Sequence, residues 1–164
     1  MLNLSESFRA SASILIKMAD AQKEDPDLRL PENEGLQGEE EALWRKLNTV
    51  EMDIIRTLSA DLWYLADGGP HPESMEPTDE MRTEFNRLKS REYYDQNEDE
   101  CLLKLMVMLH DCPKIAVEQE GATIRWFVWT SLHQEEMARR FGELLVSNPK
   151  WQSSMVAPAL ESRS

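Results

Sequence analysis

Several features that mark membrane, secreted or phosphate-binding proteins are scarce in this sequence or missing from it. No stretch reaches the roughly 18 consecutive apolar residues of a membrane span. Residues 1–17 lack the basic segment and the continuous apolar run that together make a signal peptide. The six glycines are scattered and form no phosphate-binding loop. We therefore expect a cytoplasmic protein that does not bind membranes.

Cysteine is also scarce, with Cys101 and Cys112 as the two examples. On one helix they would lie about 16 Å apart along the axis, whereas a disulfide requires Cα atoms within about 7 Å. No intramolecular disulfide is expected, in agreement with a reducing compartment. The cluster His110-Asp111-Cys112 lacks the second ligand pair of a zinc site, so we expect neither a metal nor another cofactor.

Positive charge is the third scarcity, because 18 basic residues face 31 acidic ones and leave a net charge of −13. Residues 19–41 hold nine acidic and two basic residues (net −7), and residues 72–100 hold ten and four (net −6). Direct binding to a nucleic-acid phosphate backbone needs a basic footprint, so it is not expected. Acidic surfaces can steer a basic protein partner, or they can simply maintain solubility.

Residues 101–109 are the most apolar stretch of the chain. Acidic residues precede this stretch, where they suit the positive end of a helix dipole, and Pro113 supplies a stop. These flanks favour a helix over residues 98–111, begun by a capping box at residues 95–98 or 97–100. A helix that is apolar nearly all round must be surrounded by other elements, so we place it at the centre of the fold.

Helical periodicity marks four further segments. It is clearest in residues 39–67, where apolar residues recur every three or four positions. Residues 5–22 and about three turns from Thr78 show the same period. Residues 123–129 are rich in β-branched and aromatic residues, as in a strand. Since no partner strand is visible, we favour a helix over residues 122–147.

These patterns predict an all-α protein with about five helices, packed as an irregular bundle or as stacked helical hairpins. We expect residues 1–150 to form a single helical domain, since this length suits one hydrophobic core. Residues 151–164 are mostly small and polar, and we expect them to form a flexible C-terminal tail.

Residues 60–66, Ala-Asp-Leu-Trp-Tyr-Leu-Ala, offer one specific hypothesis. They resemble the second catalytic helix of the all-α nucleotide pyrophosphohydrolases of the MazG type, in which an E-x-x-D pair precedes a Leu-Trp-Tyr-Leu-like segment. Asp61 matches the aspartate of that pair, and Leu58 stands where the family has glutamate. The resemblance implies a metal-dependent nucleotide hydrolase in which Asp61 and acids from a second chain hold magnesium.

Two kinds of side chain are candidates for a binding surface. Trp126, Phe127 and Trp129 lie close together in the predicted helix 122–147, where they either fill the core or anchor a partner. The other candidates are the acidic residues that begin the two most apolar predicted helices: Glu39, Glu40, Glu41, Glu98, Asp99 and Glu100.

The leading hypothesis is a non-enzymatic protein-interaction or regulatory protein of the cytosol. A basic protein and a second copy of the chain are the partners that we consider. A third hypothesis is an acidic DNA mimic, whose carboxylates would stand in for phosphates. No catalytic residue is assigned, because the sequence contains neither a G-x-S-x-G nor an H-E-x-x-H motif.

Overall fold

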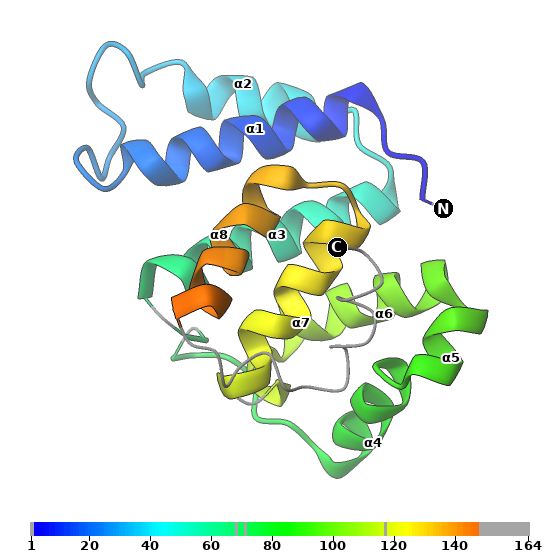
Figure 1. Ribbon diagram of the computed structural model, residues 1–164. Coiled ribbons are helices and arrows are strands. Elements are labelled where there is room, and N and C mark those ends of the chain that lie inside the picture. Colours follow the sequence, from blue (N-terminus) through cyan, green and yellow to red (C-terminus); the bar gives the residue numbers. More distant parts are fainter. Residues whose placement is uncertain (1, 68, 71, 117, 148–164) are drawn as a thin grey trace. The chain divides into compact units, whose positions relative to one another are not determined.

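The computed structural model describes residues 2–67, 69–70, 72–116 and 118–147, and over these residues it contains helices and no strand (Figure 1). The helices are α1 (Glu6–Ala21), α2 (Leu36–Trp44), α3 (Thr49–Asp67), α4 (Asp79–Leu88), α5 (Arg91–Gln96), α6 (Glu98–Asp111), α7 (Glu118–Ser131) and α8 (Glu135–Ser147), with a 3-10 helix η1 (Pro113–Ile115) after α6. The all-α class is confirmed. The predicted number of about five helices is wrong, because the described residues alone form eight α-helices. The predicted tail, residues 151–164, lies outside the described residues.

The prediction of one continuous helix over residues 39–67 is wrong, because α2 ends at Trp44 and α3 begins at Thr49. Asn48 and Glu51 form a capping box there: the Glu51 amide donates to Asn48 Oδ1 (2.8 Å), and the Asn48 amide donates to Glu51 Oε1 (3.2 Å). This reciprocal pair satisfies amides at the start of α3 and so favours a new helix at Thr49 over a continued one.

The predicted helix over residues 122–147 is interrupted as well, between α7 and α8. His133 has a φ of 57°, in the left-handed region. Its amide donates to the Thr130 carbonyl (3.1 Å), and the Gln134 amide donates to the Trp129 carbonyl (2.9 Å). These two bonds are the pattern of a Schellman motif, which ends a helix. Helix is nevertheless the correct choice over strand for residues 123–129, which lie in α7.

The predicted bounds of α6, Glu98 to Asp111, are confirmed. Its predicted capping box does not form: Asn97 makes no side-chain cap bond, and its Nδ2 donates to the Tyr93 carbonyl of α5 instead (3.1 Å). The start of α4 follows the prediction, since Thr78 Oγ1 accepts a hydrogen bond from the Met81 amide (3.2 Å).

Packing divides the chain into two compact units, where the sequence predicted one domain over residues 1–150. The N-terminal unit is Asn3–Leu62, and the C-terminal unit contains the described residues from Trp63 onward together with Leu2. The long helix α3 belongs to the first unit up to Leu62 and to the second beyond it. Among the helices of the described residues, none combines the length and apolar character needed to cross a bilayer.

In the N-terminal unit, α2 folds back along α1 as a hairpin (Figure 1). The buried Glu51 carboxylate accepts a hydrogen bond from the Ser5 amide (2.7 Å) in addition to that from Asn48. One carboxylate therefore joins the starts of α1 and α3. Burial alone would raise the pKa of Glu51, but the hydrogen bonds from Ser5 and Asn48 outweigh it and hold the pKa below its ordinary value.

In the C-terminal unit, α8 folds back along α7, and α6 contacts α4, α5, η1 and α7 (Figure 1). Gly142 of α8 allows the close approach of α7, because a Cβ there would lie 3.0 Å from Trp126 Nε1. The buried apolar side chains of this unit include Phe85, Leu88, Leu105, Met106, Leu109, Ile124, Phe127, Trp129 and Phe141.

Candidate protein-interaction surface

One face of α6 is uncovered, although its apolar sequence predicted a helix surrounded on all sides. Five of its residues are buried: Cys101, Leu102, Leu105, Met106 and Leu109. Val107, by contrast, keeps 39% of its surface exposed, and Leu103 and Met108 are half-buried. These three side chains give α6 an apolar strip that its neighbours leave partly uncovered.

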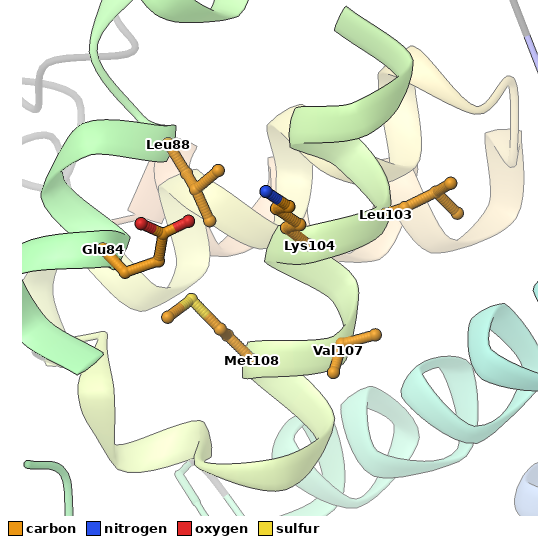
Figure 2. Close-up of a pocket in the computed structure, with 6 residues that line it drawn as sticks. All are labelled: Glu84, Leu88, Leu103, Lys104, Val107 and Met108. Atoms are coloured by element: carbon orange, nitrogen blue, oxygen red, sulfur yellow. The ribbon is translucent and has the colours of Figure 1, made fainter. Parts of the chain in front are cut away.

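The uncovered face borders a cleft of about 270 Å³ between α4 and α6 (Figure 2). Its lining residues are Glu84 and Leu88 of α4 and Leu103, Lys104, Val107 and Met108 of α6. Figure 2 shows Glu84, Leu88 and Met108 between the two helices, whereas Leu103 points away from α4. The apolar surface thus continues from this α4–α6 cleft across the outer side of α6.

The two charged groups of the α4–α6 cleft are each neutralised within their own helix. Glu84 pairs with Arg87 (2.5 Å), and Lys104 pairs with Glu100 (2.8 Å). The hydrogen bond from Arg87 lowers the pKa of Glu84, and the hydrogen bond to Glu100 raises the pKa of Lys104. Glu84 and Lys104 are therefore ionised at neutral pH, and together with Arg87 and Glu100 they form a paired polar rim around an apolar floor.

The predicted aromatic site residues lie mostly in the interior. Phe127 and Trp129 are buried, and the Phe127 ring meets the Tyr94 ring edge to face at a centroid distance of 4.9 Å. Trp126 is half-buried against Gly142. Among the tryptophans that the structure describes, Trp63 of α3 is the exposed one, with 44% of its surface exposed. A partner that used Phe127 or Trp129 would have to displace core packing first.

The six predicted acidic residues divide between two helices, with Glu39, Glu40 and Glu41 on α2 and Glu98, Asp99 and Glu100 on α6. Within each triplet the residues are consecutive, so their side chains point about 100° apart around the helix. Neither triplet by itself forms the straight row of carboxylates that the DNA-mimic hypothesis requires. Glu100 stands at the edge of the α4–α6 cleft, through its pair with Lys104.

Neither cysteine is placed for nucleophilic chemistry. Cys101 and Cys112 are both buried, and burial raises the pKa of each thiol. Cys112 Sγ also donates to the Met75 carbonyl (3.1 Å). In the portion of the chain that the structure describes, no three His, Cys, Asp or Glu side chains are grouped to hold a metal ion.

Asp61, the residue of the MazG-type resemblance, is buried on α3. The other acids of that helix are Glu51, Asp53 and Asp67. They lie about 15, 12 and 9 Å from Asp61 along the axis, whereas magnesium ligands must meet within about 2.1 Å of one ion. Glu51 is also engaged with Ser5 and Asn48. A magnesium site at Asp61 would therefore need acids from outside α3.

Comparison of the chain with protein-family models, with curated proteins and with solved structures finds no match.

None of the apolar residues that line the α4–α6 cleft was predicted from the sequence to belong to a binding surface. Leu88 belongs to a narrow apolar stripe on α4, and Leu103, Val107 and Met108 belong to the apolar run of α6. The available signal was the run itself, because a helix that is apolar on every side needs more neighbours than a short chain readily provides. The sequence alone instead predicts that this apolar run is buried at the centre of the fold.

Proposed function

We propose that this chain is a non-enzymatic, cytosolic protein-interaction or regulatory protein that binds a protein partner through the α4–α6 cleft. The single observation that carries the proposal is the apolar face of α6, with an exposed Val107 and a half-buried Leu103, next to a concave space. Fully burying an exposed valine or leucine side chain is worth about 1.5–3 kcal/mol, and the exposed part of Val107 can contribute a share of that to a complex. Pockets that take one apolar anchor are typical of interface hot spots.

The chemistry of the α4–α6 cleft supports binding over catalysis. Its polar lining groups are Glu84 and Lys104, and both are already paired, with Arg87 and Glu100. A general acid or base needs a pKa near the working pH, and these pairs move the pKa of both groups away from neutrality. The remaining four lining side chains are apolar, so they can contribute packing and exclusion of water.

The open form of the cleft supports a protein partner over a small molecule. Small-molecule pockets bury most of the ligand's surface, whereas this cleft is open to solvent over much of its extent. Its volume of about 270 Å³ suits an inserted side chain whose own chain continues along α6. The half-buried Leu103 and Met108 extend the apolar contact beyond the space itself.

Position-specific photocrosslinking in native lysate tests this proposal. A benzophenone amino acid replaces Val107 in one chain and Val146 of α8 in the control, since Val146 is a helical valine outside the cleft and 76% exposed. We expect one protein to be captured at position 107 and not at position 146, and to be lost when Leu103→Glu is added. Equal capture at both positions, or none together with a monomer in sedimentation, would refute the proposal.

A further inference from the structure

We infer that the occupant of the α4–α6 cleft is a basic amphipathic helix of a partner protein, an inference that rests on the proposed function. Two independent features of the α4–α6 cleft point to this partner. The geometry of the apolar surface indicates the shape of the bound segment. The charge around that surface indicates the sign of the segment's net charge.

The geometry excludes the other common modes of peptide recognition. Strand addition needs an exposed sheet edge, and the described helical residues offer none. Polyproline segments bind aromatic-lined grooves, but the lining of the α4–α6 cleft contains no aromatic side chain. Recognition of phosphorylated peptides uses arginine clusters, whereas both basic groups at this rim, Arg87 and Lys104, are paired with carboxylates. A helix laid into the groove remains.

The spacing of the apolar residues suits such a helix. Leu103 and Val107 are four residues apart on α6, which places them about 6 Å from each other along its surface. Apolar residues three or four apart on a partner helix have the same separation, so one can enter the cleft beside Met108 while the next covers Leu103. The contact then follows α6 for about two turns.

The surrounding charge favours a basic partner. From Asp79 to Asp111 the chain carries nine acidic and five basic residues, a net charge of −4, and the whole chain carries −13. A second copy would bring the same negative charge to the contact and be repelled at long range, whereas a basic helix would be attracted. At the rim, Glu84 and Glu100 can each accept a further hydrogen bond from a lysine or arginine of the partner.

Three synthetic peptides, each long enough for about five helical turns, test the apolar geometry and the charge separately. The first has leucines on one helical face and lysines elsewhere. The second keeps the leucines and replaces lysine with glutamate. The third has the composition of the first in an order that spreads the leucines around the helix. Binding to the full chain, to Val107→Glu and to the charge-matched control Val146→Glu is measured by calorimetry, with thermal melts as a check on folding.

We expect the first peptide to bind the full chain at least tenfold more tightly than the other two, with an affinity that falls as salt rises. Val107→Glu should weaken it at least tenfold, and Val146→Glu less than twofold. Because both variants add one negative charge, electrostatics alone would strengthen the binding of a basic peptide to either. Weaker binding by Val107→Glu and not by Val146→Glu therefore shows that the apolar contact is responsible. Val107→Leu keeps an apolar side chain at this position, so it should bind the first peptide at least as tightly as the original chain.

The outcomes separate this inference from the proposed function. If the acidic amphipathic peptide binds as tightly, with the same dependence on Val107, the basic partner is refuted while the cleft remains a protein-binding site. If the scrambled basic peptide binds equally, charge alone is responsible and the helical occupant is refuted. If the chain dimerises and Val107→Glu abolishes the dimer, a second copy is the occupant. If Val107→Glu changes no affinity and no self-association, the proposed function fails as well.

Discussion

The buried Glu51 carboxylate should be worth more to stability than any surface acid of the chain, and Glu51→Gln tests this. The carboxylate accepts hydrogen bonds from the amides of Ser5 (2.7 Å) and Asn48 (3.2 Å), one at the start of α1 and one at the start of α3. Glutamine keeps the shape but offers one accepting oxygen, and its NH₂ group cannot accept from an amide. One of the two backbone amides is then left without its acceptor.

The magnitude follows from that lost acceptor. A hydrogen bond to a charged group contributes about 1.5–3 kcal/mol. We therefore expect Glu51→Gln to lower the free energy of unfolding by about 2 kcal/mol. Glu41→Gln on α2 is the matched control, because Glu41 is exposed, and surface substitutions usually stay within about 0.5 kcal/mol.

The effect of Glu51→Gln should also depend on pH in a definite direction. The folded chain holds the pKa of Glu51 below its ordinary value, so ionised Glu51 stabilises the fold. This stabilisation is fully present above the pKa of an unfolded glutamate, about 4.3, and is lost as the pH falls through the lower folded-state pKa. Urea unfolding at neutral pH and in acid measures it. Equal stability of Glu51→Gln and Glu41→Gln at neutral pH would refute this account of Glu51.

Further predictions concern a histidine, two glycines and the two cysteines. His133→Gly should raise stability by about 0.5–1 kcal/mol in urea unfolding, because glycine adopts the left-handed backbone of residue 133 without strain, and a loss would show that the histidine side chain contributes more than its strain costs. Gly38→Ala should stabilise by about 0.5–1 kcal/mol, as nothing lies within 4 Å of an added Cβ. Gly121→Ala should destabilise by about 1–3 kcal/mol, since its Cβ would lie 3.0 Å from a buried tyrosine hydroxyl. Destabilisation by Gly38→Ala, or stabilisation by Gly121→Ala, would contradict the packing. Cys101 and Cys112 should react with a thiol reagent far more slowly in the native chain than in urea, because burial raises the pKa of both, and fast native reaction would show that the thiols are accessible.

The sequence predicts helix ends well where local chemistry marks them. Both ends of α6 were predicted correctly because acids precede it and Pro113 follows it. The break before α3 was marked by the Asn48–Glu51 pair, but the apolar period of Leu43, Leu47 and Val50 runs through it and suggested one long helix. In the structure Val50 keeps 36% of its surface exposed and is no part of the core, so its place in that period was coincidental.

Other features have no local signal. The break before α8 uses His133 in a left-handed conformation, where glycine is the usual residue, and no sequence rule selects a histidine for it. The α4–α6 cleft depends on which neighbours cover α6. α4 has 10 residues and α6 has 14, lengths of about 15 and 21 Å. The shorter helix cannot cover the longer one along its whole length, and periodicity in either sequence does not reveal this.

Charge and apolar surface carry different weight as signs of a binding site. A surface carboxylate keeps its hydration, so the net charge of −13 is compatible with solubility alone. An apolar side chain at the surface instead forgoes about 25 cal/mol for each Å² that could be buried. At the α4–α6 cleft the neighbouring charges are paired within each helix, so a partner that fills it buries Leu103 and Val107 without desolvating an isolated charge. The acids then govern how fast a basic partner arrives, and the apolar cleft governs how long it stays.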